Sequence, residues 1–194
     1  MTRLILASAS ASRAQILTSA GVVFDVVPAN VDEDTVKASV EEPRAVAEAL
    51  ASLKAFTVSA SHPGHLVLGA DQVLVLEGRI MSKAPDLATA AEHLRRLRGR
   101  RHVLISALAL ARGGAPVWRH ASVAALTMRD FSDAFLDDYL AREGEEVLGS
   151  VGCYRLEGLG AQLFETVEGD YFSILGLPLQ PLLGALRGFG VILA

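Results

Sequence analysis

The sequence has a single cysteine, few aromatic residues and little net charge, and each scarcity excludes a class of protein. Cys153 alone cannot form an intrachain disulfide or a cysteine-rich zinc site, a usage that fits a reducing compartment. A net charge of −4 argues against a general affinity for nucleic acid. No hydrophobic run has the length of a membrane span or of a signal-peptide core. We therefore expect a cytoplasmic protein that binds neither nucleic acid nor a membrane.

The pattern of hydrophobic residues predicts an α/β fold with a mixed sheet and interleaved helices. Hydrophobic residues make up 51% of the 194 residues, enough for a substantial core. No internal repeat or linker-like stretch divides the chain, so we predict a single domain over 1–194; two small lobes that share one sheet are the alternative. Apolar runs predict strands at 4–7, 22–28, 66–76, 102–111 and 117–128. Capping and stop signals predict five helices. The first ends at Gly21, and the second begins at Pro43 and ends near Ser61. The others run from Asp86 to Gly99, from Ser132 to Gly144 and from Pro178 to Gly188.

The stretch from Leu66 to Pro85 places an isolated carboxylate inside an apolar strand. Asp71 is too costly to bury unpaired, so it must meet a cation, a metal or hydrogen-bond donors. Residues 77–79 form a turn signal, and the returning strand of this hairpin would bring Lys83 close to Asp71. A structural ion pair and a functional site are both compatible with this pattern.

A serine-rich loop follows the first predicted strand and leads into a helix. A helix N-terminus offers unpaired N–H groups, and here Ser8, Ser10, Ser12 and Arg13 add hydroxyls and a guanidinium. The loop is a candidate phosphate site, although it lacks the P-loop pattern. The alternative is that Ser10 or Ser12 only caps the helix.

Further charged residues lie elsewhere in the chain. The run 31–34 predicts an acidic loop that is either solvated or able to hold a divalent cation, with Glu33 as a candidate ligand. Lys54 lies at the edge of the apolar stripe of its helix, where it either extends to solvent or reaches a phosphate. Glu157 lies in the glycine-rich stretch that begins at Gly149. This stretch is either a turn with an exposed Glu157 or a segment whose backbone can closely approach a flat ligand.

Taken together, these residues suit the cleavage of a phosphoanhydride: cations for a polyphosphate, and Glu33 and Asp71 for a metal or a water molecule. The chain also resembles the Maf family over nearly its whole length. The resemblance lies in an ordered set of motifs: LILASASASRAQIL, VDED, LASLKA, GADQV, SKAPD and GCYRLEGLGAQLFETVEGDYFSILGLPL.

The resemblance implies a metal-dependent nucleoside triphosphate pyrophosphatase that releases pyrophosphate from a non-standard or modified nucleotide. The expected cofactor is Mg²⁺ or Mn²⁺, and the expected partner is the nucleotide; a homodimer is compatible with the sequence. The family fold is a mixed α/β structure, related to inosine triphosphatases, with a long curved sheet, flanking helices and a cleft between two lobes.

The family's functional positions match individual residues of this chain. The proton acceptor matches Asp71, and the two lysines match Lys54 and Lys83. The phosphate loop matches Ser8, Ser10, Ser12 and Arg13, although a proline and one arginine of the family motif are absent. The pair Gln72 and Glu157 resembles the branch linked to 7-methyl-GTP, and a carboxylate can accept hydrogen bonds from the N1–H and amino group of guanine.

Two alternatives remain open at this stage. The family was named for an effect on septum formation, so the chain could be a nucleotide-binding regulator of cell division without catalysis. A phosphatase with Asp71 as nucleophile would release orthophosphate through an acyl phosphate. The absence of a DxD motif at this strand disfavours the phosphatase.

Overall fold

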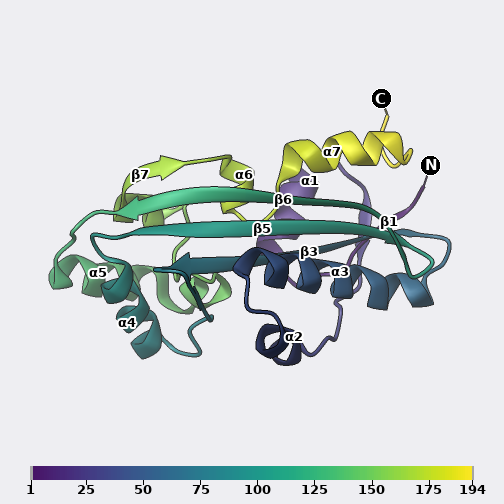
Figure 1. Ribbon diagram of the computed structural model, residues 1–194. Coiled ribbons are helices and arrows are strands. Elements are labelled where there is room, and N and C mark those ends of the chain that lie inside the picture. Colours follow the sequence, from purple (N-terminus) through teal and green to yellow (C-terminus); the bar gives the residue numbers. More distant parts are fainter. Residues whose placement is uncertain (1, 194) are drawn as a thin grey trace. The chain divides into compact units, whose positions relative to one another are not determined.

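Strands of both orientations form one sheet in the computed structural model, which describes residues 2–193 (Figure 1). The sheet order is β2-β1-β3-β5-β6-β7, and β4 also pairs with β3. β1 is parallel to β2 and β3, whereas β4 is antiparallel to β3 and β7 to β6. The strands are β1 Leu4–Leu6, β2 Phe24–Val26, β3 Leu66–Leu76, β4 Arg79–Met81, β5 Arg101–Arg112, β6 Ala115–Met128 and β7 Phe164–Glu168.

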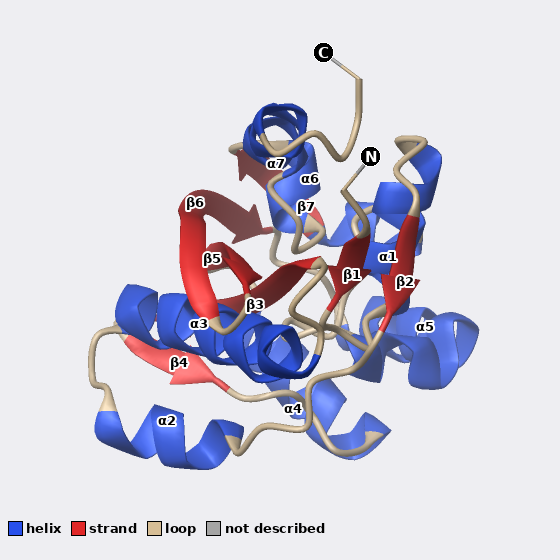
Figure 2. Cartoon of the chain, turned by 90° about the vertical axis from the view of Figure 1, so that its right-hand side faces the viewer, coloured by secondary structure: helices blue, strands red, loops and turns tan. Residues whose placement is uncertain are grey.

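Helices connect these strands and flank the sheet, which confirms the predicted mixed α/β class (Figures 1 and 2). The α-helices are α1 Ala11–Ser19, α2 Glu33–Ser39, α3 Pro43–Ser61, α4 Leu87–Leu97, α5 Asp133–Glu143, α6 Tyr171–Ile174 and α7 Leu179–Gly188. Two 3₁₀ helices span Gly144–Gly149 and Leu159–Leu163. Within residues 2–193, no helix combines the length and the apolar character that a membrane span requires.

The chain divides into two compact units. Unit 1 comprises Met1–Gln72, Ile105–Ser122 and Asp170–Ala194, and unit 2 comprises Val73–Leu104 and Val123–Gly169. The long strands β3, β5 and β6 contribute residues to both. The predicted single domain, the curvature of the sheet and the cleft between lobes stay predictions.

In unit 1, alternate residues of β3 face different helices. Leu66, Leu68 and Ala70 pack in one core cluster with residues of α1 and α7. Val67 instead packs with Val58 of α3. Because side chains alternate along a strand, Asp71 points to the α3 face and its neighbour Gln72 to the other. The two candidate residues of β3 therefore belong to different environments.

Gly69 allows α3 to approach β3 closely. A Cβ atom at this position would collide with the backbone of α3 at the Ala51 carbonyl and the Ala55 nitrogen. Gly69 is two residues before Asp71 and thus on the same face of β3. The close approach brings the turn of α3 that carries Lys54 against the strand that carries Asp71.

We expect Gly69→Ala to lower the free energy of unfolding by about 1–3 kcal/mol, because overpacking must displace α3. Urea denaturation measures this loss. Gly64→Ala is the matched control, since a Cβ at Gly64 has nothing within 4 Å. Equal stability of the two variants would contradict the close-packing role of Gly69.

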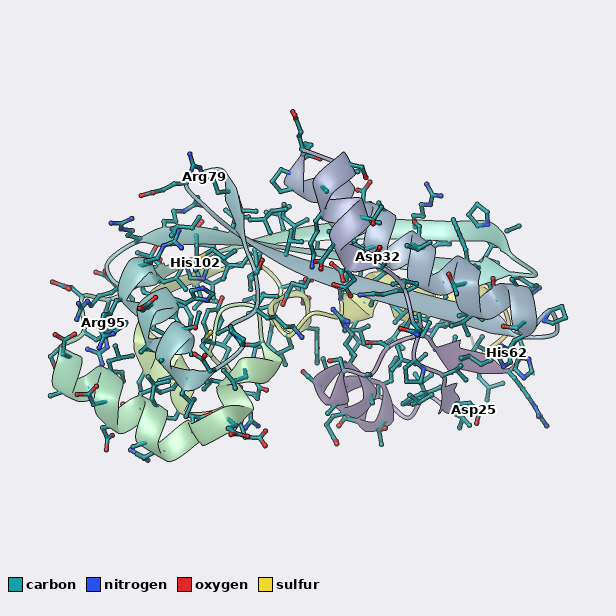
Figure 3. All side chains as sticks on the ribbon, turned by 90° about the horizontal axis from the view of Figure 1, so that it is seen from below. Asp25, Asp32, His62, Arg79, Arg95 and His102 are labelled. Carbon is teal, nitrogen blue, oxygen red and sulfur yellow. The ribbon has the colours of Figure 1, made fainter. Side chains whose placement is uncertain are left out.

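In unit 2, a buried histidine lies in an aromatic cluster (Figure 3). His102 is 1% exposed, and its Nε2 lies 2.8 Å from the hydroxyl of Tyr154. The Tyr154 ring packs edge-on against Phe164 with 4.8 Å between centroids. Burial lowers the pKa of His102 to about 4. The histidine is therefore neutral in the folded protein at neutral pH.

This lowered pKa predicts acid sensitivity. Between about pH 6.5 and 4 the unfolded chain binds a proton at His102 that the folded protein does not bind. The free energy of unfolding is therefore highest above the pKa of His102 in the unfolded chain. It falls by about 3 kcal/mol in total as the pH decreases toward 4. Urea titrations from pH 4 to 7.5 should show this slope. A similar slope in His102→Gln would assign the sensitivity to other groups.

The structure corrects several predicted boundaries. The second strand covers only Phe24–Val26 rather than 22–28. The strand predicted at 66–76 is confirmed, because β3 runs from Leu66 to Leu76 through Asp71. The predicted acidic loop is wrong in part, because Glu33 begins α2. Asp32 caps that helix by accepting a hydrogen bond from the Thr35 nitrogen at 3.1 Å (Figure 3). The Asp-x-x-Thr spacing was the local signal for this helix start.

Candidate active site

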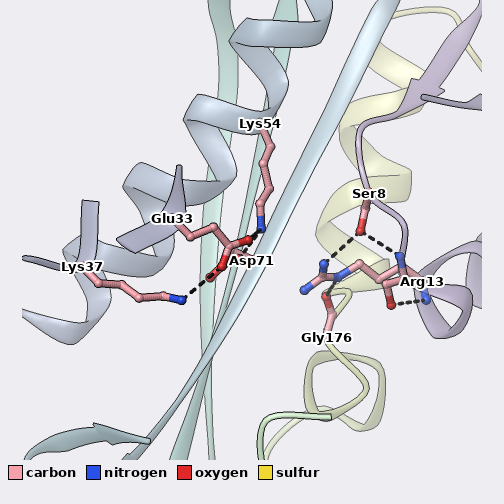
Figure 4. A network of polar contacts seen from close by, with 8 residues as sticks. Ser8, Arg13, Glu33, Lys37, Lys54, Asp71 and Gly176 are labelled. Carbon is pink, nitrogen blue, oxygen red and sulfur yellow. Dashed lines mark hydrogen bonds and ion pairs between the residues drawn. The ribbon is translucent and has the colours of Figure 1, made fainter. Parts of the chain in front are cut away.

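Lys54 joins two carboxylates that are far apart in the sequence (Figure 4). Its Nζ lies 2.6 Å from Oδ1 of Asp71 and 2.7 Å from Oε1 of Glu33. The Lys54 and Asp71 side chains are only 12% and 10% exposed, whereas Glu33 is 39% exposed. Of the alternatives for Lys54, extension to solvent is excluded. The predicted need of Asp71 for a compensating partner is met by a lysine from α3.

Glu33 is held in its charged form by two lysines. Burial by itself would raise the pKa of Glu33, but hydrogen bonds and charge from Lys54 and Lys37 outweigh burial and lower it. Lys37 lies one turn along α2, with its Nζ 3.1 Å from Oε2. Lys37 belongs to none of the motifs in the sequence, although an i,i+4 Glu-to-Lys pair is recognisable once α2 is known.

Arg13 is fixed at the start of α1. Its Nε donates to the Gly176 carbonyl at 2.9 Å and its Nη1 to the Ser8 hydroxyl at 3.1 Å. Burial lowers the pKa of Arg13, while the charges of Asp71 and Glu33 oppose that effect. Arg13, Asp71 and Glu33 all belong to unit 1, and the two carboxylates favour the charged form of the guanidinium.

The serines of the loop have different partners. Ser10 caps α1, since its hydroxyl accepts from the Arg13 nitrogen at 3.4 Å. Ser8 is 8% exposed and its hydroxyl accepts from both Arg13 and the Ser10 nitrogen. The Ser12 hydroxyl faces the Leu175 carbonyl at 3.5 Å. The capping alternative is therefore realised by Ser10, and the binding of phosphate by this loop stays a prediction.

The other predicted site residues are Gln72, Lys83 and Glu157. Gln72, next to Asp71, donates from its side-chain amide to Ser106, Ser173 and Ile174. Lys83 and Glu157 belong to unit 2. Lys83 follows β4, whose register pairs Met81 with Leu74. This confirms the predicted hairpin, while the pairing of Lys83 with Asp71 stays a prediction.

Glu157 lies beside Arg155, whose Nε is 3.6 Å from Oε1. Two glycines near Glu157 are closely packed against other residues of the protein. A Cβ at Gly152 would meet the Tyr154 ring, and a Cβ at Gly160 would meet the backbone of Arg155. Close packing within unit 2 is thus sufficient to explain these two glycines.

The donor chemistry at Lys54 fits a hard divalent cation. Glu33 and Asp71 direct carboxylate oxygens at one common positive group. Mg²⁺ is usually held by one or two carboxylates together with phosphates of the substrate and water, rather than by a complete protein cage. Within residues 2–193, no group of three or more His, Cys, Asp and Glu side chains is arranged to hold a metal ion.

Comparison with known proteins places the chain in a family. The family described as Maf-like protein matches residues 3–189. A nucleoside triphosphate pyrophosphatase of Granulibacter bethesdensis is 53% identical over 189 residues, which cover 95% of this chain and 96% of that protein. A 7-methyl-GTP pyrophosphatase of Rhizobium etli is 50% identical over 194 residues, which cover 98% of both chains. The chain belongs to the Maf family.

Proposed function

We propose that the chain is a nucleoside triphosphate pyrophosphatase that converts a non-standard or modified nucleotide into the monophosphate and pyrophosphate. The observation that carries the proposal is the contact of Lys54 with both Asp71 and Glu33. This contact brings one lysine and two acidic residues together in unit 1. Arg13 belongs to the same unit, and the charges of Asp71 and Glu33 favour its charged form. Relatives at about 50% identity over nearly the full chain carry this activity in their names.

In the proposed reaction a water oxygen forms a bond to the α-phosphorus, and the bond from that phosphorus to the bridging oxygen breaks. Asp71 orients the water and accepts its proton. Lys54 and Arg13 stabilise the negative charge of the triphosphate and of the leaving pyrophosphate. Lys83 is proposed as a further cation for this charge. A Mg²⁺ or Mn²⁺ ion held by Glu33 and Asp71 would lower the pKa of water and neutralise phosphate charge.

The remaining substrate contacts are also part of the proposal. Ser8, Ser10 and Ser12 would surround the phosphates together with Arg13, at the N-terminus of α1. Gln72 and Glu157 would contact the base, with 7-methyl-GTP as the leading candidate substrate. The carboxylate of Glu157 provides an acceptor for guanine N–H groups. A cytoplasmic location and a homodimeric state stay predictions.

A panel of nucleoside triphosphates with Mg²⁺ or Mn²⁺ tests the proposed function. We expect one equivalent each of pyrophosphate and monophosphate, with the highest kcat/KM for a modified purine nucleotide. Binding without any product would favour the regulatory alternative. Orthophosphate as first product would favour the phosphatase.

Glu157→Gln tests the base contact. The amide keeps one acceptor but places donors opposite the guanine N–H groups, so we expect about 10-fold lower preference for 7-methyl-GTP over UTP. Ratios of kcat/KM for the two nucleotides measure this effect. Glu165→Gln, a change on exposed β7, is the control. An unchanged ratio in Glu157→Gln would remove this residue from the specificity argument.

A further inference from the structure

A buried polar network lies on the face of β3 opposite Lys54. Ser106 of β5 is 1% exposed, and its hydroxyl donates to the Ser173 carbonyl at 2.7 Å. The Nε2 of Gln72 directs its two hydrogens at three acceptors, so at least one hydrogen is shared. The acceptors are the Ser106 hydroxyl at 2.8 Å and the carbonyls of Ser173 and Ile174 at 3.1 and 3.0 Å. The predicted roles of the sequence motifs leave Ser106 and Ser173 unexplained.

The acceptors determine the direction of every bond in this network. The carbonyls of Ser173 and Ile174 can only accept, so the Gln72 amide must direct its nitrogen toward them. The Ser106 hydroxyl gives its one hydrogen to Ser173 and accepts from Gln72. Consequently the amide nitrogen of Gln72 already donates its hydrogens to protein acceptors. Any hydrogen bond of this side chain with a base would be accepted by Oε1.

The segment from Ser173 to Gly176 also contacts Arg13 at its Gly176 end. The Ser173 carbonyl also accepts from the Gly176 nitrogen at 3.0 Å, which closes a turn. The carbonyl of Gly176 then accepts from Arg13 Nε at 2.9 Å. A chain of hydrogen bonds thus runs from Ser106 through Ser173 and Gly176 to the guanidinium.

Asp170 secures the start of this turn. Its Oδ2 accepts from both the nitrogen and the hydroxyl of Ser173, at 2.7 and 2.8 Å. Gly176 has a φ of +90°, a backbone conformation that favours glycine. The turn is therefore fixed at Ser173, and its exit at Gly176 is shaped to present a carbonyl to Arg13.

We propose that Ser106 and Gln72 are positioning residues that set the orientation of Arg13 through the Ser173–Gly176 turn. This inference rests on the proposed function, in which Arg13 binds the triphosphate. A guanidinium held in one plane loses less freedom when it binds phosphate, whereas a released one binds in many orientations.

The first test is Ser106→Ala, assayed by pyrophosphate release. We expect KM for the triphosphate to rise about 10-fold with little change in kcat, because the misplaced group is a binding cation. Ser59→Ala is the matched control: Ser59 is 0% exposed, and its hydroxyl accepts from the Gly114 nitrogen at 3.0 Å in the same unit. An equal KM in the two variants would overturn the proposal.

A double-mutant cycle tests whether Ser106 acts through Arg13. In an Arg13→Ala background, Ser106→Ala should change kcat/KM by less than about 2-fold, since the group it positions is gone. The full effect in that background would mean that Ser106 acts by another route and would overturn the proposal.

A readout without substrate separates this inference from the proposed function. In ¹H–¹⁵N spectra, the Nε–H of Arg13 should exchange slowly in the wild type and in Ser59→Ala, and faster in Ser106→Ala. If no triphosphate is hydrolysed but this difference appears, the proposed function fails and the positioning role stands. Equal exchange in all three proteins would overturn the positioning role.

Discussion

Asp71→Asn is expected to lower kcat for pyrophosphate release by about 10³-fold or more while the protein remains folded. The amide has nearly the shape of the carboxylate but cannot accept a proton from water. It also removes the negative partner that lies 2.6 Å from Lys54. Single-turnover rates at saturating nucleotide measure the chemical step directly, and circular dichroism checks the fold.

A surface substitution provides the control for this experiment. Asp25→Asn removes one carboxylate from the exposed strand β2 of the same unit and should leave kcat unchanged (Figure 3). An Asp71→Asn enzyme with more than about a tenth of wild-type kcat would not be compatible with a general-base role.

Lys54→Met should impair both activity and stability. Methionine keeps an unbranched apolar side chain, one atom shorter than lysine, but leaves Asp71 and Glu33 without their shared cation. We expect kcat/KM to fall about 10²- to 10³-fold. The free energy of unfolding at pH 7 should fall by about 2–3 kcal/mol, less than for a fully buried pair because Glu33 is partly exposed.

The pH dependence distinguishes this electrostatic effect from lost packing. Without Lys54 the pKa of Glu33 should rise, since burial is then opposed only by Lys37. Protonation of the carboxylates would remove the uncompensated charge, so the stability deficit of Lys54→Met should shrink as the pH falls through the raised pKa of Glu33. Lys54→Arg, which keeps the charge, should retain most of the stability. A deficit independent of pH would indicate that packing dominates.

The sequence was sufficient for the elements that have strong local signals. Pro43 and the apolar stripe located α3, and Asp86 and Ser132 marked the caps of α4 and α5. Glu77 and Gly78 located the β3–β4 turn. Boundaries without such signals were less accurate, because the extent of β2 depends on its pairing with β1 rather than on propensity.

The sequence by itself determined which residue types were available: a lone acid in an apolar strand, a serine and arginine loop, and an isolated lysine on a helix. Only the tertiary structure decided that Lys54, rather than solvent, compensates Asp71 and Glu33, because this depends on the approach of α3 to β3 at Gly69. The link from Ser106 to Arg13 was equally inaccessible to sequence reasoning. It is made through backbone carbonyls, whose positions are set by chain folding and not by side-chain identity.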